Sequence, residues 1–199
     1  MKNLVCLPAA LLAFAISYAQ PKNEENNNRQ LAFGKAVETI LGDFPYNYKH
    51  ISGNLLIAQG EWEHYASTIT LPGAKNCVVG RYHSVLDTTA SWEAVMFSSE
   101  EFEAAAREYK RLFHQLNTCK MKTVDGSVFY LDGKLEQPDV VLDFVTSTFR
   151  VQTSDERYRL FKIELELLYQ MNEWVININM VSKKKDSDMR PDWMADNQP

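Results

Sequence analysis

Residues 161–180 have the sequence FKIELELLYQMNEWVININM, and this stretch decides the class of fold. Apolar and charged side chains alternate across residues 161–169, and apolar side chains alternate with asparagine across residues 174–180. A period of two is typical of antiparallel strands that bury one face and leave the other polar. Residues 170–173 separate the two runs and predict a hairpin turn. We therefore expect two neighbouring antiparallel strands here.

The residues upstream of this hairpin predict further strands. Residues 141–149 repeat the period of two. Asp125-Gly126 lies between the runs 121–124 and 127–131, and an Asp-Gly pair favours a two-residue hairpin turn. We expect these runs to extend the same sheet.

Two amphipathic helices are also expected. Ser98 and Glu101 have the spacing of a capping box, in which both side chains satisfy backbone donors at a helix start. Apolar residues then recur every three or four positions, which predicts a helix that ends near Asn117. An earlier helix is predicted over residues 29–41, with Gly42 as its C-terminal cap.

A three-stranded meander is predicted between the helices, over residues 64–71, 77–84 and 92–97. Residues 72–75 form the first turn, because Pro and Gly favour reversal of the chain. If this hairpin is symmetric about Gly73-Ala74, His64 lies opposite His83. The register of the two strands then determines which side chains share a face.

The element order is α-β-β-β-α-β-β-β, with a possible pseudo-repeat of a helix and three strands. A parallel sheet is disfavoured, because the predicted elements do not alternate as strand, helix and strand. We therefore predict an α+β fold, in which two helices pack on one face of a single antiparallel sheet of about six strands. The helices leave the other face of the sheet uncovered.

The two ends of the chain differ in composition from its middle. Residues 1–19 have the positive start, short apolar run and small-residue cleavage pattern of a secretory signal peptide, and an uncleaved anchor is the weaker alternative. Residues 20–28 are a polar leader, residues 29–182 a single globular α+β domain, and residues 183–199 a tail that we expect to be disordered. The protein is thus expected to be exported, to the periplasm or outside the cell. The lack of an N-glycosylation sequon favours a bacterial source.

Charge and hydropathy exclude two classes of partner. The net charge of −5 argues against nucleic acid, because phosphate binding needs a basic face. No stretch after residue 19 approaches about 18 consecutive apolar residues, so no membrane span is expected once the signal peptide is removed. An unidentified small molecule or protein is the expected partner.

Cys77 and Cys119 are the cysteines that follow the predicted cleavage site. An even number in an exported chain favours one disulfide, here Cys77–Cys119. Two free buried thiols are the main alternative. Metal ligation is disfavoured, because the chain has no CxxC spacing.

The sequence contains no GxSxG, HExxH, Walker or GxGxxG motif. We therefore assign no catalytic residue, no cofactor and no metal site. His64 and His83 could hold a metal only with a third ligand, so a half-exposed pair is the preferred interpretation.

Aromatic and basic residues on the meander and in the loop before it are candidates for a binding surface: Trp62, His64, Arg81, His83, Tyr46 and Tyr48. Coverage of a sheet edge is the alternative role for the aromatic residues.

The leading hypothesis is a non-enzymatic exported domain that binds a ligand or a protein through the sheet face that the helices do not cover. The first alternative is a small hydrolase-like enzyme with His64 or His83 as base. The second is a structural envelope protein whose sheet edges pair with partners.

Overall fold

The structure is a computed structural model that describes residues 20–83, 88–122 and 126–182. The predicted signal peptide and C-terminal tail lie outside the described residues. Within these residues the chain forms two α-helices, α1 (Gln20–Asp43) and α2 (Phe102–Asn117), and two short 3₁₀ helices, η1 (Phe44–Tyr46) and η2 (Glu156–Tyr158).

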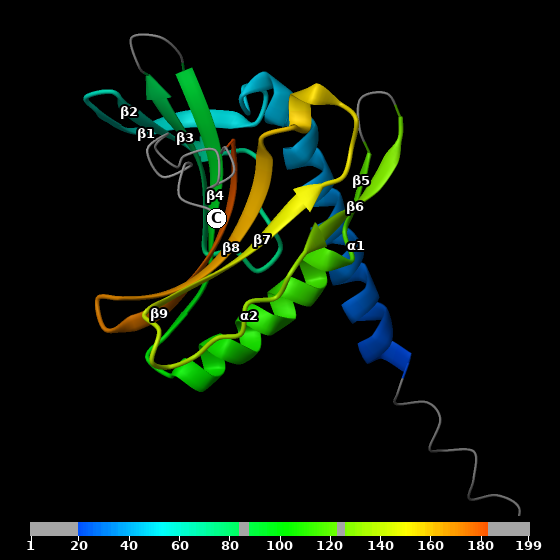
Figure 1. Ribbon diagram of the computed structural model, residues 1–199, viewed down its shortest axis with the longest axis vertical. Helices are drawn as coiled ribbons and strands as arrows, with labels where there is room; N and C mark the ends of the chain where they lie inside the picture. Colours follow the sequence, from blue (N-terminus) through cyan, green and yellow to red (C-terminus); the bar gives the residue numbers. More distant parts are fainter. Residues whose placement is uncertain (1–19, 84–87, 123–125, 183–199) are drawn as a thin grey trace, which may run out of the picture.

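The strands form an antiparallel sheet in the order β1-β2-β3-β4-β9-β8-β7-β6-β5 (Figure 1). Their bounds are β1 Ser52–Gln59, β2 Trp62–Ser67, β3 Asn76–His83, β4 Thr88–Ser99, β5 Lys120–Lys122, β6 Val128–Gly133, β7 Phe144–Val151, β8 Phe161–Gln170 and β9 Glu173–Ser182. Eight of these strands make the main sheet, and the three-residue β5 pairs with β6 at its edge. The α+β class, the single antiparallel sheet and the two helices are confirmed. The strand number of about six was too low.

The β8–β9 hairpin lies at the centre of the sheet and matches its prediction closely. The pairs run from Phe161 with Ser182 to Gln170 with Glu173. Met171 and Asn172 form the turn with φ of 51° and 65°, the left-handed values that a tight two-residue hairpin requires. The turn therefore fixes the register, and every second residue of both strands points into the core.

The hydrophobic core lies between this sheet and the helices. Buried residues of α1 and α2 join alternate residues of the strands in one cluster. Helix α2 packs against β4, β6, β8 and β9, and it lies beside the sheet in Figure 1. There the Tyr109 hydroxyl donates to Ser147 Oγ at 2.7 Å, and the Phe113 and Phe149 rings lie 4.8 Å apart.

Helix α1 begins at Gln20, earlier than the predicted Arg29, and so includes the predicted polar leader. Its buried face is spaced at helical intervals: Phe33, Val37, Ile40 and Leu41. Leu31, which the periodicity places near this face, is instead 71% exposed. The helix continues through Gly42 to Asp43, whose carboxylate accepts hydrogen bonds from the backbone of His50 and Ile51.

The first half of the sheet differs most from its prediction. An additional hairpin, β1–β2, turns at Gly60, whose φ is +62°. In the next hairpin Trp62 pairs with Tyr82 and His64 pairs with Gly80, a shift of three residues from the predicted register. Because three is odd, His64 and His83 point to opposite faces of the sheet, so the predicted histidine pair is wrong.

The start of α2 also differs in detail. Glu101 is the N-cap and makes no side-chain capping bond, while its N–H donates to Ser99 Oγ at 3.0 Å. Ser98 belongs to β4, and its hydroxyl accepts from Lys75 Nζ. The predicted capping box between Ser98 and Glu101 is therefore not formed, although the helix ends at Asn117 as expected.

Cys77 and Cys119 are both buried and both free, which corrects the predicted disulfide. Cys77 lies on the core side of β3, and Cys119 follows the end of α2. Burial raises the pKa of Cys77 and raises the pKa of Cys119 to about 12, so both thiols stay protonated. They act as small apolar side chains.

Among the described helices, none combines the length and apolar character needed to cross a membrane.

Candidate binding groove on the polar face of the sheet

The strands carry polar side chains on the face that points away from the core cluster, which we term the polar face. The cross-strand pairs place Glu93 beside Asn179, and Asn179 beside Glu164. The adjacent row places Asn177 beside Glu166. Two rows of carboxylates and amides therefore cross the middle of the sheet.

A groove of about 330 Å³ lies over these rows. It is lined by Trp62, Gly80, Tyr82, Thr89, Ala90, Ser91, Glu93, Glu164, Glu166, Asn179, Val181 and Ser182. The Trp62 and Tyr82 rings are 4.8 Å apart at one end, and the Trp62 side chain is 53% exposed. The groove thus joins an accessible aromatic pair to a floor of hydrogen-bonding groups.

Gly80 keeps the centre of the groove open. A Cβ added there would lie 3.0 Å from Ser91 Oγ, 3.5 Å from Glu93 Oε1 and 3.7 Å from His64 Cδ2. Three polar side chains therefore converge above a residue that has no side chain of its own. A larger residue would fill this space.

The polar face contains both satisfied and unsatisfied polar atoms. Ser91 Oγ donates to Glu93 Oε1 at 2.7 Å, and Asn179 Nδ2 donates to Glu166 Oε2 at 2.7 Å. Asn177 Oδ1 and Thr146 Oγ1 are buried and have no hydrogen-bond partner within the part of the chain that the structure describes. Asn177 lines a small adjoining hollow of about 90 Å³, which shares Glu93 and Asn179 with the groove. A buried acceptor without a donor is costly, and a ligand N–H could supply the missing bond.

The opposite side of β2 and β3 holds Arg81 and His83, away from the groove. His83 Nε2 lies 2.9 Å from Glu63 Oε2, and Tyr65 donates to the same carboxylate oxygen at 2.8 Å. These bonds, with His83 contributing most, lower the pKa of Glu63. The Arg81 guanidinium lies 5.2 Å from the centre of the Tyr65 ring. This cluster stabilises the ionised state of Glu63.

The two tyrosines of the loop after α1 are also separated from the groove. Tyr46 is 51% exposed and contacts His50, at a ring distance of 5.1 Å. Tyr48 is fully buried, and its hydroxyl donates to the Met180 carbonyl at 2.8 Å. Of the predicted binding residues, Trp62 lines the groove, His64 lies beside Gly80 at its centre, and the other four lie elsewhere.

Sequence reasoning missed Tyr82, Glu93 and the β8–β9 polar rows as parts of one site. The alternation of residues 161–180 placed Glu164, Glu166 and Asn179 on a common face. That these residues lie near Trp62 depends on the pairing of β4 with β9, which joins the two halves of the chain. No cluster of three or more His, Cys, Asp or Glu residues suited to a metal is found in residues 20–83, 88–122 and 126–182.

Comparisons of the chain with protein-family models, with curated proteins and with solved structures give no match.

Proposed function

We propose that this protein is exported and binds a small organic cation, without catalysis, in the groove on the polar face of the sheet. The signal-peptide pattern of residues 1–19 supports export. The observation that carries the binding proposal is the accessible Trp62–Tyr82 pair beside the acceptor-rich floor.

The chemistry of the lining favours a cation over a neutral ligand or an anion. Aromatic faces attract positive charge, and carboxylates accept hydrogen bonds from N–H donors. The groove lining contains Glu93, Glu164 and Glu166 but no Lys or Arg among the described residues. Asn177 Oδ1 adds a buried acceptor next to Glu93.

Two observations favour binding over the hydrolase-like alternative. Ser91 Oγ and His64 Cδ2 both lie within 4 Å of a Cβ placed on Gly80, but the Ser91 hydroxyl donates to Glu93. His83 is engaged by Glu63 on the other side of the strands. Within the described residues, Ser91 is therefore not held by His64 in the way that acyl transfer requires of a nucleophile and its base.

Calorimetric titration of the full chain with three probes tests this function. Argininamide supplies a cation with N–H donors, choline supplies a cation without them, and glucose is neutral. We expect affinity to fall in that order. Replacement of Trp62 by Ala should weaken the binding of both cations about tenfold. Glu93→Gln should weaken the binding of argininamide about fivefold and should weaken the binding of choline less.

Matched controls are Tyr130→Ala, which removes a 58% exposed aromatic on β6, and Glu103→Gln, which removes an exposed carboxylate on α2. Both should leave the affinities unchanged. Equal loss of affinity in Glu103→Gln and Glu93→Gln would show that the effect of Glu93→Gln comes only from the change in net charge. Tighter binding of glucose than of argininamide would contradict the proposal that the ligand is a cation.

A further inference from the structure

The small hollow of about 90 Å³ that adjoins the groove extends the groove along the polar face, because it shares Glu93 and Asn179 with it. Its polar lining consists of Asn76, Glu93, Asn177 and Asn179. A water molecule takes about 30 Å³, so the hollow has room for an ammonium group, which is of similar size. The groove therefore continues into a small polar space of the right size for one charged head group.

The acceptors of this small hollow match an ammonium group. Asn177 Oδ1 is buried and has no hydrogen-bond partner within residues 20–83, 88–122 and 126–182. Glu93 accepts a hydrogen bond from the Ser91 hydroxyl, and because that donor is neutral, the carboxylate keeps its charge and its second oxygen. A primary ammonium group carries a full charge and three N–H donors, so it can pair with both acceptors at once. A quaternary ammonium group has no N–H donor and would leave the buried acceptor unsatisfied.

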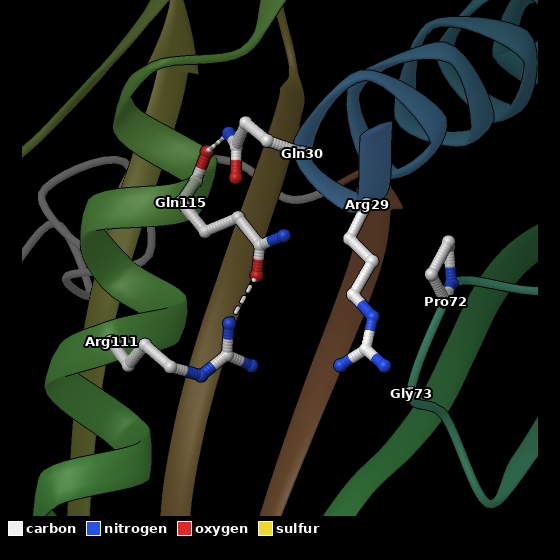
Figure 2. A pocket seen from close by; sticks show the side chains of 6 residues that line it. All are labelled: Arg29, Gln30, Pro72, Gly73, Arg111 and Gln115. Carbon is white, nitrogen blue, oxygen red and sulfur yellow. Dashed lines mark hydrogen bonds between the residues drawn. The ribbon is translucent and has the colours of Figure 1, made fainter. Parts of the chain in front are cut away.

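The larger hollow between α1, α2 and the turn that precedes β3 differs from the small one (Figure 2). Its volume is about 710 Å³, and its polar side chains bond to protein groups. Gln30 donates to the Gln115 carbonyl, and Arg111 donates to the Gln115 side chain. Arg111 also forms an ion pair with Glu108. Among the described residues, none of the buried polar atoms that lack a partner lies in this lining. The unsatisfied acceptor therefore points to the small hollow on the polar face.

The aromatic pair and the small hollow lie toward opposite ends of the groove. Tyr82 lies opposite Thr89, and Glu93 follows four residues later on β4. At about 3.3 Å per residue, the two positions are about 13 Å apart along the strand. Gly80 and Ser91 pair with each other between these positions, and the missing side chain of Gly80 keeps this stretch open. Two positions that attract positive charge are thus separated by an open path along the sheet.

From this geometry we propose that the groove and the small hollow together bind a long aliphatic diamine or polyamine, with one terminal ammonium group in the hollow and the other against the Trp62–Tyr82 pair. This inference rests on the proposed function, because it names the kind of cation that the groove binds.

The length of the ligand follows from the separation of the two positions. Single bonds of about 1.5 Å in an extended zigzag chain place the nitrogens of 1,8-diaminooctane about 11 Å apart. This length reaches both positions when each nitrogen stands about 3 Å from its partner atoms. The nitrogens of 1,4-diaminobutane are only about 6 Å apart, so this shorter diamine reaches one position at a time.

Calorimetric titration of the full chain, at constant ionic strength, compares three amines. 1,8-Diaminooctane has the length and both charges, 1,4-diaminobutane has both charges without the length, and octylamine has the length with a single charge. We expect 1,8-diaminooctane to bind with one-to-one stoichiometry and at least about tenfold more tightly than either of the others. Equal affinity of the two diamines, or equal affinity of 1,8-diaminooctane and octylamine, would overturn the inference.

Replacement of Asn177 by Ala tests the position of the ammonium group in the small hollow. Asn177→Ala should weaken the binding of 1,8-diaminooctane about fivefold, because one acceptor is lost. The affinity for choline, whose expected contact is the aromatic pair, should change by less than about twofold.

Asn54→Ala is the matched control, since it removes an exposed asparagine of β1 that lines neither the groove nor the small hollow. It should leave the affinity for 1,8-diaminooctane unchanged. Unchanged affinity in Asn177→Ala, or an equal loss in Asn54→Ala, would overturn the position of the ammonium group. Circular dichroism of each variant confirms that the fold is retained.

The same titrations separate this inference from the proposed function. If argininamide and choline bind as expected but the diamines show no dependence on length, only the diamine inference fails. If argininamide and choline do not bind while 1,8-diaminooctane does, the choice of a long diamine stands and the wider class of small cations fails. If no cation binds, both proposals fail.

Discussion

The two faces of the sheet are built from the same strands but follow different physical rules. On β8 the core face carries Ile163, Leu165 and Leu167, all fully buried. The polar face of the same strand carries Lys162, Glu164 and Glu166. One residue of displacement along the strand therefore separates a hydrophobic core from a row of charges.

Burial explains the core face but not the polar face. Apolar side chains contribute roughly 25 cal/mol per Å² removed from water, so the core side chains stabilise the fold directly. Glu164, in contrast, is only 8% exposed, and desolvation of a charge costs free energy. An apolar residue would avoid that cost, and the proposed binding function would account for the carboxylate at this position.

The largest expected contrast is between an aromatic residue on each face. Phe149→Ala should lower the free energy of unfolding by about 3–5 kcal/mol, because Phe149 is fully buried against Phe113. Trp62→Ala should lower it by less than about 1 kcal/mol, since Trp62 is half exposed. Urea unfolding followed by circular dichroism measures both. A larger loss in Trp62→Ala would assign the groove aromatics to the core.

A smaller contrast compares two glycines. A Cβ on Gly133 would lie 2.4–2.8 Å from ring carbons of Phe149, so Gly133→Ala should destabilise the protein by about 1–3 kcal/mol. Gly34, on α1, has no atom within 4 Å of the same position. Gly34→Ala should stabilise the protein by up to about 1 kcal/mol through helix propensity. Equal unfolding midpoints for the two variants would contradict the packing around Phe149.

A buried hydroxyl on the core face gives a pH-dependent prediction. The Tyr109 hydroxyl bonds to Ser147 Oγ and the Leu165 carbonyl, so Tyr109→Phe should cost about 0.5–1.5 kcal/mol. Burial raises the pKa of Tyr109 from 10.0 to about 12. The folded state therefore keeps a proton that the unfolded chain loses, and this contribution is complete below pH 10 and lost between pH 10 and 12.

Unfolding free energies measured from pH 8 to pH 12 check this prediction. The wild type should lose stability above pH 10 more steeply than Tyr109→Phe. Parallel pH profiles for the two proteins would show that the Tyr109 pKa is not raised.

The smallest expected effect concerns the two thiols of the core. Cys77 and Cys119 should resist iodoacetamide in the folded protein, since they are 6% and 2% exposed. Both should be alkylated in urea without any reductant, as peptide mapping would show. Failure of both peptides to label until a reductant is added would restore the predicted disulfide.

The parts of the fold that the sequence predicts well are those fixed by local signals. The β8–β9 register follows from a two-residue turn, and α2 follows from its helical periodicity. The predicted register of the β2–β3 hairpin was wrong because β2 ends at Ser67, well before Pro72 and Gly73. The symmetric hairpin assumed around that turn is therefore not formed.

The candidate sites were harder to predict because they depend on contacts between distant segments. Trp62 meets Glu164 only through the pairing of β4 with β9. The individual residues and the local periodicity can be recognised in the sequence, but no local signal specifies which distant segments come together.

Nuclear magnetic resonance titration of the ¹⁵N-labelled protein with argininamide tests the central claim most directly. The account predicts saturable amide shifts that cluster at Gly80, Tyr82, Ser91 and Asn179, and that need about tenfold more argininamide in Trp62→Ala. Shifts that spread evenly over exposed carboxylates of α2 and the loops, or that persist unchanged in Trp62→Ala, would contradict it.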